Sequence, residues 1–177
     1  MGAADDPKTP ASRSGGRRGV EREPMVEQLR RVDHVGIAVP DLEAAVAAFT
    51  TLFGAGPESV HDVAEQKVRT AFFAAGDTQI ELLWPLSADS PISNFLAKRG
   101  PGIHHICFEV PNIERALEEY RAAGVRLIDE TPRLGAHGKR IAFLHPKSTG
   151  GILIEICEVP RPGCDPHPAR PHIATER

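Results

Sequence analysis

The chain has 177 residues, of which 41% are hydrophobic, and it carries a formal net charge of −3. This length and composition suit one globular domain with a proper core. Residues 25–159 hold 13 basic and 18 acidic residues, and this net charge of −5 argues against a nucleic-acid surface. No apolar run approaches the roughly 20 residues that cross a membrane, and the amino terminus lacks the apolar centre of a secretory signal.

Both ends of the chain differ from its middle. Residues 1–24 are rich in Gly, Pro, Ser and Arg without hydrophobic periodicity. We expect them to form a disordered leader, with Met25 as an alternative translation start. Residues 160–177 contain five prolines and are expected to form a disordered tail. The three cysteines show no paired spacing, which is typical of a protein from a reducing cytoplasm.

Between these ends, the first group of predicted elements is a strand, a helix and three strands. A strand is expected at residues 33–39. Asp41 is expected to cap a helix that ends at Gly54, because apolar residues recur there with the 3.6-residue period. Strands follow near residues 59–62, 68–74 and 79–83.

Ser90 and Pro91 then begin a short helix that is predicted to run to Lys98. The second group repeats the first order, with a strand near 104–110, a helix from Asn112 to Gly124, and strands near 125–129, 140–144 and 152–158. We therefore predict an α+β fold within residues 25–159. Two tandem βαβββ modules, at about residues 30–85 and 102–158, are expected to form one cupped mixed sheet.

The two modules carry a histidine and a glutamate at matching places. His34 and His105 open matching strands 71 residues apart. Glu81 follows His34 by 47 residues, and Glu155 follows His105 by 50 residues, each within an apolar strand. Because alternate side chains of a strand share a face, all four are expected on the inner face of the sheet.

A metal site explains these four residues together. A lone strand histidine or glutamate is usually structural, but here the same register occurs twice. An unpaired carboxylate in mid-strand would cost several kcal/mol or neutralise. Imidazole and carboxylate suit a divalent cation of borderline hardness. His104 is expected on the opposite face, as a core histidine.

Several motifs carry a family resemblance over about residues 28–158. They are Asp33-His34-Val-Gly-Ile-Ala-Val, Gly102-Ile-His-His105-Ile and the long run from Gly138 to Glu155. The chain resembles the vicinal oxygen chelate superfamily and, within it, the methylmalonyl-CoA epimerase family. The resemblance implies a cupped sheet around a divalent cation (Co, Mn, Ni, Zn or Mg, which the sequence does not distinguish), an acyl-CoA substrate and a homodimer without nucleic-acid or membrane partners.

The resemblance also implies the reaction. A base removes the proton between thioester and carboxylate, the metal stabilises the resulting enolate, and an acid returns a proton on the other face. It points to Glu155 as the first base. Some family members have a second carboxylate where this chain has Thr70, so Glu65 or a water on the metal would have to substitute. Gln66 and Thr70 are expected to bind the substrate, with Gln66 orienting its carboxylate.

Lys139, Arg140 and Lys147 flank the last two strands and are expected to hold CoA phosphates. Three alternatives remain open to the sequence. They are epimerisation of ethylmalonyl-CoA or a related acyl-CoA, a glyoxalase-type isomerase, and a metal-free binding or resistance protein of the same fold. The intact quartet of His34, Glu81, His105 and Glu155 speaks against the last. An extradiol dioxygenase is disfavoured, since its iron takes two histidines and one carboxylate.

Overall fold

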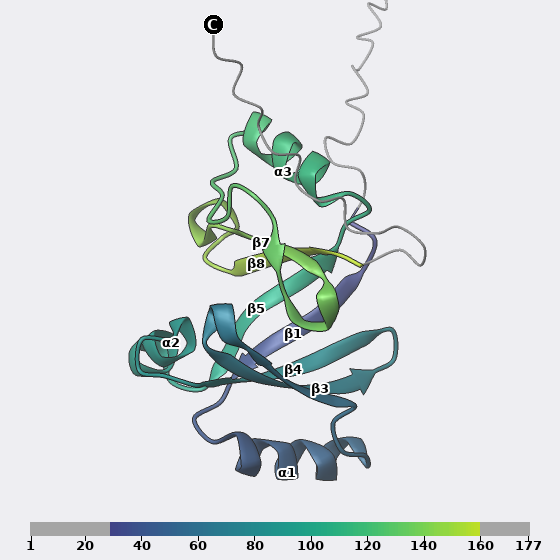
Figure 1. Cartoon of the computed structure of the whole chain (residues 1–177), viewed down its shortest axis with the longest axis vertical. Coiled ribbons are helices and arrows are strands. Elements are labelled where there is room, and N and C mark those ends of the chain that lie inside the picture. Colours follow the sequence, from purple (N-terminus) through teal and green to yellow (C-terminus); the bar gives the residue numbers. More distant parts are fainter. Residues whose placement is uncertain (1–28, 160–177) are drawn as a thin grey trace, which may run out of the picture.

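The computed structural model describes residues 29–159 (Figure 1). The predicted leader at residues 1–24, the predicted tail at 160–177 and Cys164 lie outside the described residues. Within the described part, no helix combines the length and the apolar character that a bilayer crossing requires.

Eight strands form one mixed sheet in the order β2-β3-β4-β1-β5-β8-β7-β6. The two modules meet at its centre, where β1 and β5 pair antiparallel, and each module also contains one parallel pair, β1 with β4 and β5 with β8. The predicted α+β fold of two βαβββ modules is confirmed. The strands are β1 (Val32–Ala38), β2 (Ser59–Val63), β3 (Val68–Ala75), β4 (Thr78–Pro85), β5 (Gly102–Glu109), β6 (Arg133–Leu134), β7 (Arg140–Leu144) and β8 (Leu153–Glu158).

The three α-helices begin at the residues predicted to cap them. Asp41 accepts a hydrogen bond from the Ala44 N–H at the start of α1 (Leu42–Phe53), which ends at Gly54 with φ 72°. Ser90 caps α2 (Pro91–Arg99), and Asn112 caps α3 (Ile113–Ala122). Short 3-10 helices η1 (Ala64–Gln66), η2 (Ala136–Gly138) and η3 (Pro146–Ser148) complete the order.

The hydrophobic core lies between the sheet and its helices. In module one, Phe49 and Phe53 of α1 pack their rings 5.8 and 5.7 Å from that of Phe73 on β3. In module two, α3 packs Ile113 and Leu117 into a cluster with residues of β7 and β8. Figure 1 shows α1 and α3 at opposite ends of the molecule, each beside the strands of its own module. The helices thus cover one face of each half-sheet and leave the other face for a site.

One strand prediction was wrong. Residues 125–129 form only an isolated bridge, between Leu127 and Leu144, and the strand on the outer side of β7, opposite β8, is β6 instead. The Asp129 carboxylate accepts the Phe143 N–H at 2.9 Å, so a side chain takes a donor that a regular ladder would use. Such side-chain competition for backbone groups ends pairing locally.

Candidate metal centre and active site

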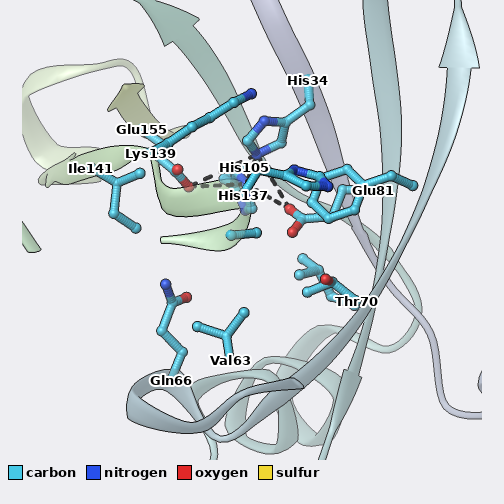
Figure 2. A pocket seen from close by; sticks show the side chains of 13 residues that line it. His34, Val63, Gln66, Thr70, Glu81, His105, His137, Lys139, Ile141 and Glu155 are labelled. Carbon is cyan, nitrogen blue, oxygen red and sulfur yellow. Dashed lines mark hydrogen bonds and ion pairs between the residues drawn. The ribbon is translucent and has the colours of Figure 1, made fainter. Parts of the chain in front are cut away.

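The four predicted ligands converge, each from its own strand. Nε2 of His34 on β1 lies 3.0 Å from Nε2 of His105 on β5 and 3.2 Å from Oε2 of Glu81 on β4. Oε2 of Glu155 on β8 lies 3.2 Å from His105 Nε2 and 4.0 Å from His34 Nε2. All four side chains are buried, and Figure 2 shows them pointing toward one another. Strand alternation predicted this convergence correctly.

An extra residue in each central strand sits beside the ligand histidine. In the pairing of β1 with β5, the register shifts between Val32 and His34, and again opposite His104, which lies between Ile103 and His105. Such β-bulges re-aim side chains and are frequent near active sites. The bulges place the side chains of Asp33 and His104 next to the two imidazoles. Strict alternation, which put His104 on the opposite face, fails at this point.

Asp33 contacts His34 at Nδ1, the ring nitrogen that does not face the quartet. Its buried carboxylate lies 2.8 Å from Nδ1 of His34 and 2.6 Å from Nζ of Lys139. Burial acts to raise the pKa of this carboxyl, but the hydrogen bonds to His34 and Lys139 outweigh it and hold the pKa well below its usual range. An ionised Asp33 accepts the Nδ1–H, so Nε2 is the His34 atom that is directed at the centre of the quartet and that would bind a metal ion.

His105 has an equivalent support. Its Nδ1 lies 3.0 Å from Nδ1 of His104. Burial and the neighbouring His105 lower the pKa of His104 to about 4, so His104 is neutral at pH 7 and can accept the His105 Nδ1–H. Both ligand histidines therefore donate outward through Nδ1 and offer Nε2 to the centre, the arrangement that metal-binding histidines adopt.

The charges of the quartet fit a divalent cation. Burial raises the pKa of Glu155, and it also opposes ionisation of Glu81, whose pKa is nevertheless lowered to about 2 by hydrogen bonds to His105 and His34. Burial works against a charged His34, yet its hydrogen bonds to Asp33 and Glu81 raise its pKa to about 10. The two buried carboxylates thus favour a positive charge between them. A divalent metal ion would supply that charge, and two imidazole nitrogens with two carboxylates are a suitable set of ligands for it.

Gly36 is required by the packing of His105. A Cβ at this position would lie 2.6 Å from Nδ1 and 2.8 Å from Nε2 of the His105 ring. Gly36 pairs with Glu81 on one side and His105 on the other, so it occupies the middle of the ligand set. Only a residue without a side chain lets the imidazole approach β1 this closely.

A hollow that is partly open to solvent extends from the quartet. Thr70 and Gln66 both line it, as predicted for substrate-binding residues. Thr70 is buried, and its Oγ1 has no hydrogen-bond partner among the described residues. Glu65, in contrast, is exposed on η1 and lines a neighbouring depression with His61 and Leu134.

The three basic residues do not form one cluster. Lys139 lines the hollow and is paired with Asp33. Arg140 pairs with Glu114 of α3 and lies 3.7 Å from Glu158, which puts it on the helix-covered face. Lys147 is exposed on η3. The structure therefore brings Lys139 to the site and keeps Arg140 away from it.

Three residues of the site, Asp33, His104 and His137, were missed by the sequence reasoning. Asp33 directly precedes His34, and His104 directly precedes His105. This repeat of a polar residue before each histidine was the sequence signal that could have indicated a role for Asp33 and His104. His137 of η2 also lines the hollow. Its φ of 56° places it there, and nothing in the sequence of this segment predicts that conformation.

Comparison with known proteins gives the family. The family model of the Glyoxalase/Bleomycin resistance protein/Dioxygenase superfamily matches residues 33–143. Methylmalonyl-CoA epimerase, mitochondrial, of Homo sapiens is 45% identical over 132 residues, which are 74% of this chain and 75% of that protein. Ethylmalonyl-CoA/methylmalonyl-CoA epimerase of Cereibacter sphaeroides is 45% identical over 133 residues, 74% of this chain and 99% of that protein.

Solved structures agree. The crystal structure of methylmalonyl-CoA epimerase from Mycobacterium tuberculosis matches with a TM-score of 0.73 and 38% identity, covering 80% of this chain and 95% of that chain. A methylmalonyl-CoA epimerase in complex with methylmalonyl-CoA and NH4+ matches with a TM-score of 0.70 and 36% identity, covering 74% and 95%. The chain therefore belongs to the Glyoxalase/Bleomycin resistance protein/Dioxygenase superfamily and, within it, to the methylmalonyl-CoA epimerase family.

Proposed function

We propose that this protein is an isomerase that interconverts (R)- and (S)-methylmalonyl-CoA. The observation that carries the proposal is the buried quartet of two imidazoles and two carboxylates, drawn from both modules, at the end of the hollow. Two relatives at 45% identity whose names include methylmalonyl-CoA epimerase support the choice of substrate.

His34, Glu81, His105 and Glu155 would hold a divalent cation, and the donor set suits Co, Mn, Ni, Zn or Mg. When bound, such a cation supplies Lewis-acid stabilisation of the charge that develops on the thioester oxygen. Asp33 and His104 fix the tautomers of the two histidines. Both imidazoles also make edge-to-face ring contacts, His34 with Phe72 and His105 with Phe143.

Glu155 is the proposed base for the α-proton. Its carboxylate is buried at the wall of the hollow, and its pKa is raised by burial. A carboxylate with a raised pKa is a better proton acceptor than an ordinary one. Gln66 and the unpartnered Thr70 hydroxyl face the same space and are suited to bind the oxygens of the substrate carboxylate.

The CoA moiety needs cationic contacts at the rim. Lys147 is exposed on η3 and is the proposed contact for a CoA phosphate. Nζ of Lys139 is already paired with the Asp33 carboxylate. Its proposed role is therefore to fix the position of Asp33, next to the place where the substrate carboxylate would bind. Glu65 lines the neighbouring depression and not the hollow of the quartet, so we assign it no role at the α-carbon.

Epimerisation of ethylmalonyl-CoA is a second candidate activity, because the Cereibacter sphaeroides relative is named for both substrates. The two substrates differ by one methylene, which an apolar pocket discriminates by only about 1–3 kcal/mol. Comparing kcat/KM for the two acyl-CoAs would decide which is preferred.

Incubating the pure protein with (S)-methylmalonyl-CoA in deuterated water tests the proposal. We expect deuterium at the α-carbon and formation of the (R) epimer. No exchange above a protein-free blank would remove the epimerase assignment. A metal-free binding protein of this fold would show no exchange and no stoichiometric metal by elemental analysis.

The predicted homodimer and cytoplasmic location belong to the same proposal. Ile103 and Ile152 are exposed and line one hollow beside β5 and β8, which offers an apolar surface for a second copy. Cys107 and Cys157 are free and buried, as expected in a reducing compartment. Size-exclusion chromatography with light scattering would measure the oligomeric state.

A further inference from the structure

The segment that carries His137 has an unusual backbone. His137 lies in η2 with φ 56° and ψ 24°, and Lys67 is the other non-glycine residue of the described chain with a positive φ. Non-glycine residues seldom adopt this backbone conformation, and those that do are often found at functional sites. Here it turns the His137 side chain into the hollow of the quartet, where Figure 2 labels it beside the ligands.

Residues of module one hold this imidazole. Nε2 of His137 lies 2.9 Å from Oγ of Ser59 on β2. Its ring centroid lies 4.5 Å from that of His61 and 4.5 Å from that of Phe72. Two residues further on, Lys139 is tied to Asp33. His137 comes from module two in sequence, but its contacts place it on the module-one wall.

The lining of the hollow leaves few groups that can transfer a proton near neutral pH. Four of its titratable residues form the quartet, and Lys139 is held in a buried ion pair. Among the described lining residues, His137 is the remaining titratable side chain. The other lining residues are Val63, Gln66, Thr70, Phe72, Leu83, Ala136 and Ile141.

We propose that His137 is a second catalytic residue, which exchanges a proton with the α-carbon on the face opposite Glu155. This inference rests on the proposed epimerase activity and deepens it. Glu155 approaches from β8 in module two, whereas His137 is held against β2 and β3. Inversion at carbon requires removal from one face and delivery to the other, so two groups on opposite walls suit the reaction.

The protons balance in both directions. In one direction, neutral His137 takes the α-proton and becomes imidazolium, the electron pair of the C–H bond passes into the enolate, and protonated Glu155 returns a proton to the other face. In the other direction, ionised Glu155 takes the proton and the His137 imidazolium delivers one. Exchange of protons with water interconverts the two enzyme forms.

The surroundings of His137 keep it neutral at rest. His137 is exposed, but its partial burial lowers its pKa below the ordinary value. The nearby His61 and Lys139 act in the same direction, whereas Glu81 and Asp33 oppose them. If Nε2–H donates to the Ser59 hydroxyl, Nδ1 is the atom that accepts the proton. Ser59 is then a positioning residue, because it selects the tautomer.

The test uses His137→Asn in the metal-loaded protein, since asparagine tolerates a positive φ better than most residues. Each epimer of methylmalonyl-CoA is incubated separately in deuterated water, and both α-deuterium content and configuration are measured. We expect inversion to fall by about 100-fold or more. Deuterium exchange without inversion should persist for one epimer only, the one whose α-proton faces Glu155.

Lys67→Asn is the matched control, because it places the same new residue at the other positive-φ position, where the native side chain pairs with Asp89 outside the hollow. It should exchange and invert like the wild type. His137→Gly, which removes backbone strain together with the imidazole, should repeat the one-sided exchange and keeps the test valid if His137→Asn folds poorly.

Two results would overturn the inference. One is inversion of both epimers by the His137 variants at near wild-type rates. The other is equal loss of exchange from both epimers together with loss of bound metal, which would indicate a structural role. If the wild type itself neither exchanges nor inverts, the proposed function fails first and this inference falls with it.

Discussion

The carboxylate of Asp33 bridges Nδ1 of His34, at 2.8 Å, and Nζ of Lys139, 106 residues away in the chain, at 2.6 Å. One buried acid thereby connects His34, a proposed metal ligand of module one, with the segment of module two that carries His137. This link gives Asp33 two duties. It fixes the histidine tautomer, and it holds the two walls of the hollow together.

Asp33→Asn should weaken metal binding about 10- to 100-fold, as loss of such an outer partner does elsewhere. The amide keeps the shape but loses the charge that favours the Nδ1–H tautomer, and it leaves Lys139 without its counter-ion. Isothermal titration of the metal-free protein with cobalt(II) measures the change. Asp62→Asn, which disrupts an exposed pair with Arg69, is the control. An unchanged affinity in the Asp33 variant would show that this acid does not tune His34.

Gly36→Ala should displace His105 and reduce the metal bound per chain. The added Cβ would overlap the imidazole, and overpacking of this kind costs about 1–3 kcal/mol. Gly56→Ala is the matched control, because a Cβ there meets nothing within 4 Å. Elemental analysis and thermal unfolding of both variants are the measurements. Full metal occupancy in Gly36→Ala would contradict the close packing of His105 on β1.

His104 should make the protein less stable as the pH falls. Burial and His105 lower its pKa to about 4, against an ordinary value of 6.5. Between these values the unfolded chain binds more protons than the folded one, so stability is lost as the pH drops through this window. The contribution to the slope is at most about 1.4 kcal/mol per pH unit.

Urea unfolding of the metal-free wild type and of His104→Gln at pH 7.5, 6.0 and 5.0 measures this effect. Glutamine does not titrate, so the variant should lose less stability between pH 7.5 and 5.0 than the wild type. Equal losses would mean that other groups account for the acid sensitivity.

Arg140→Gln should leave KM for the acyl-CoA nearly unchanged, because Arg140 pairs with Glu114 on the helix-covered face. A half-exposed pair of this kind contributes about 0–1 kcal/mol to stability. Lys147→Gln should instead raise KM with little effect on kcat. Steady-state kinetics of the two variants separates them, and a raised KM in Arg140→Gln would return that residue to the substrate site.

Period and spacing were sufficient to predict most of the fold and the convergence of the four side chains proposed as metal ligands. The helix caps at Asp41, Ser90 and Asn112 depend on residues next to them in the sequence, so they can be inferred locally. The same holds for the sheet face on which Glu81 and Glu155 lie, because side chains alternate along a strand. The strand expected at 125–129 failed because a side chain from Asp129 took the Phe143 N–H. The bulge at His104 and the positive φ of His137 also escaped prediction, since both are imposed by contacts between modules.

The central claim is that a divalent cation held by His34, Glu81, His105 and Glu155 is needed for α-proton exchange. The direct measurement is deuterium incorporation into methylmalonyl-CoA by protein treated with a chelator, before and after one equivalent of cobalt(II) is returned. We predict that exchange is lost on chelation and restored by the metal. Full exchange in protein shown by elemental analysis to be metal-free would contradict the account.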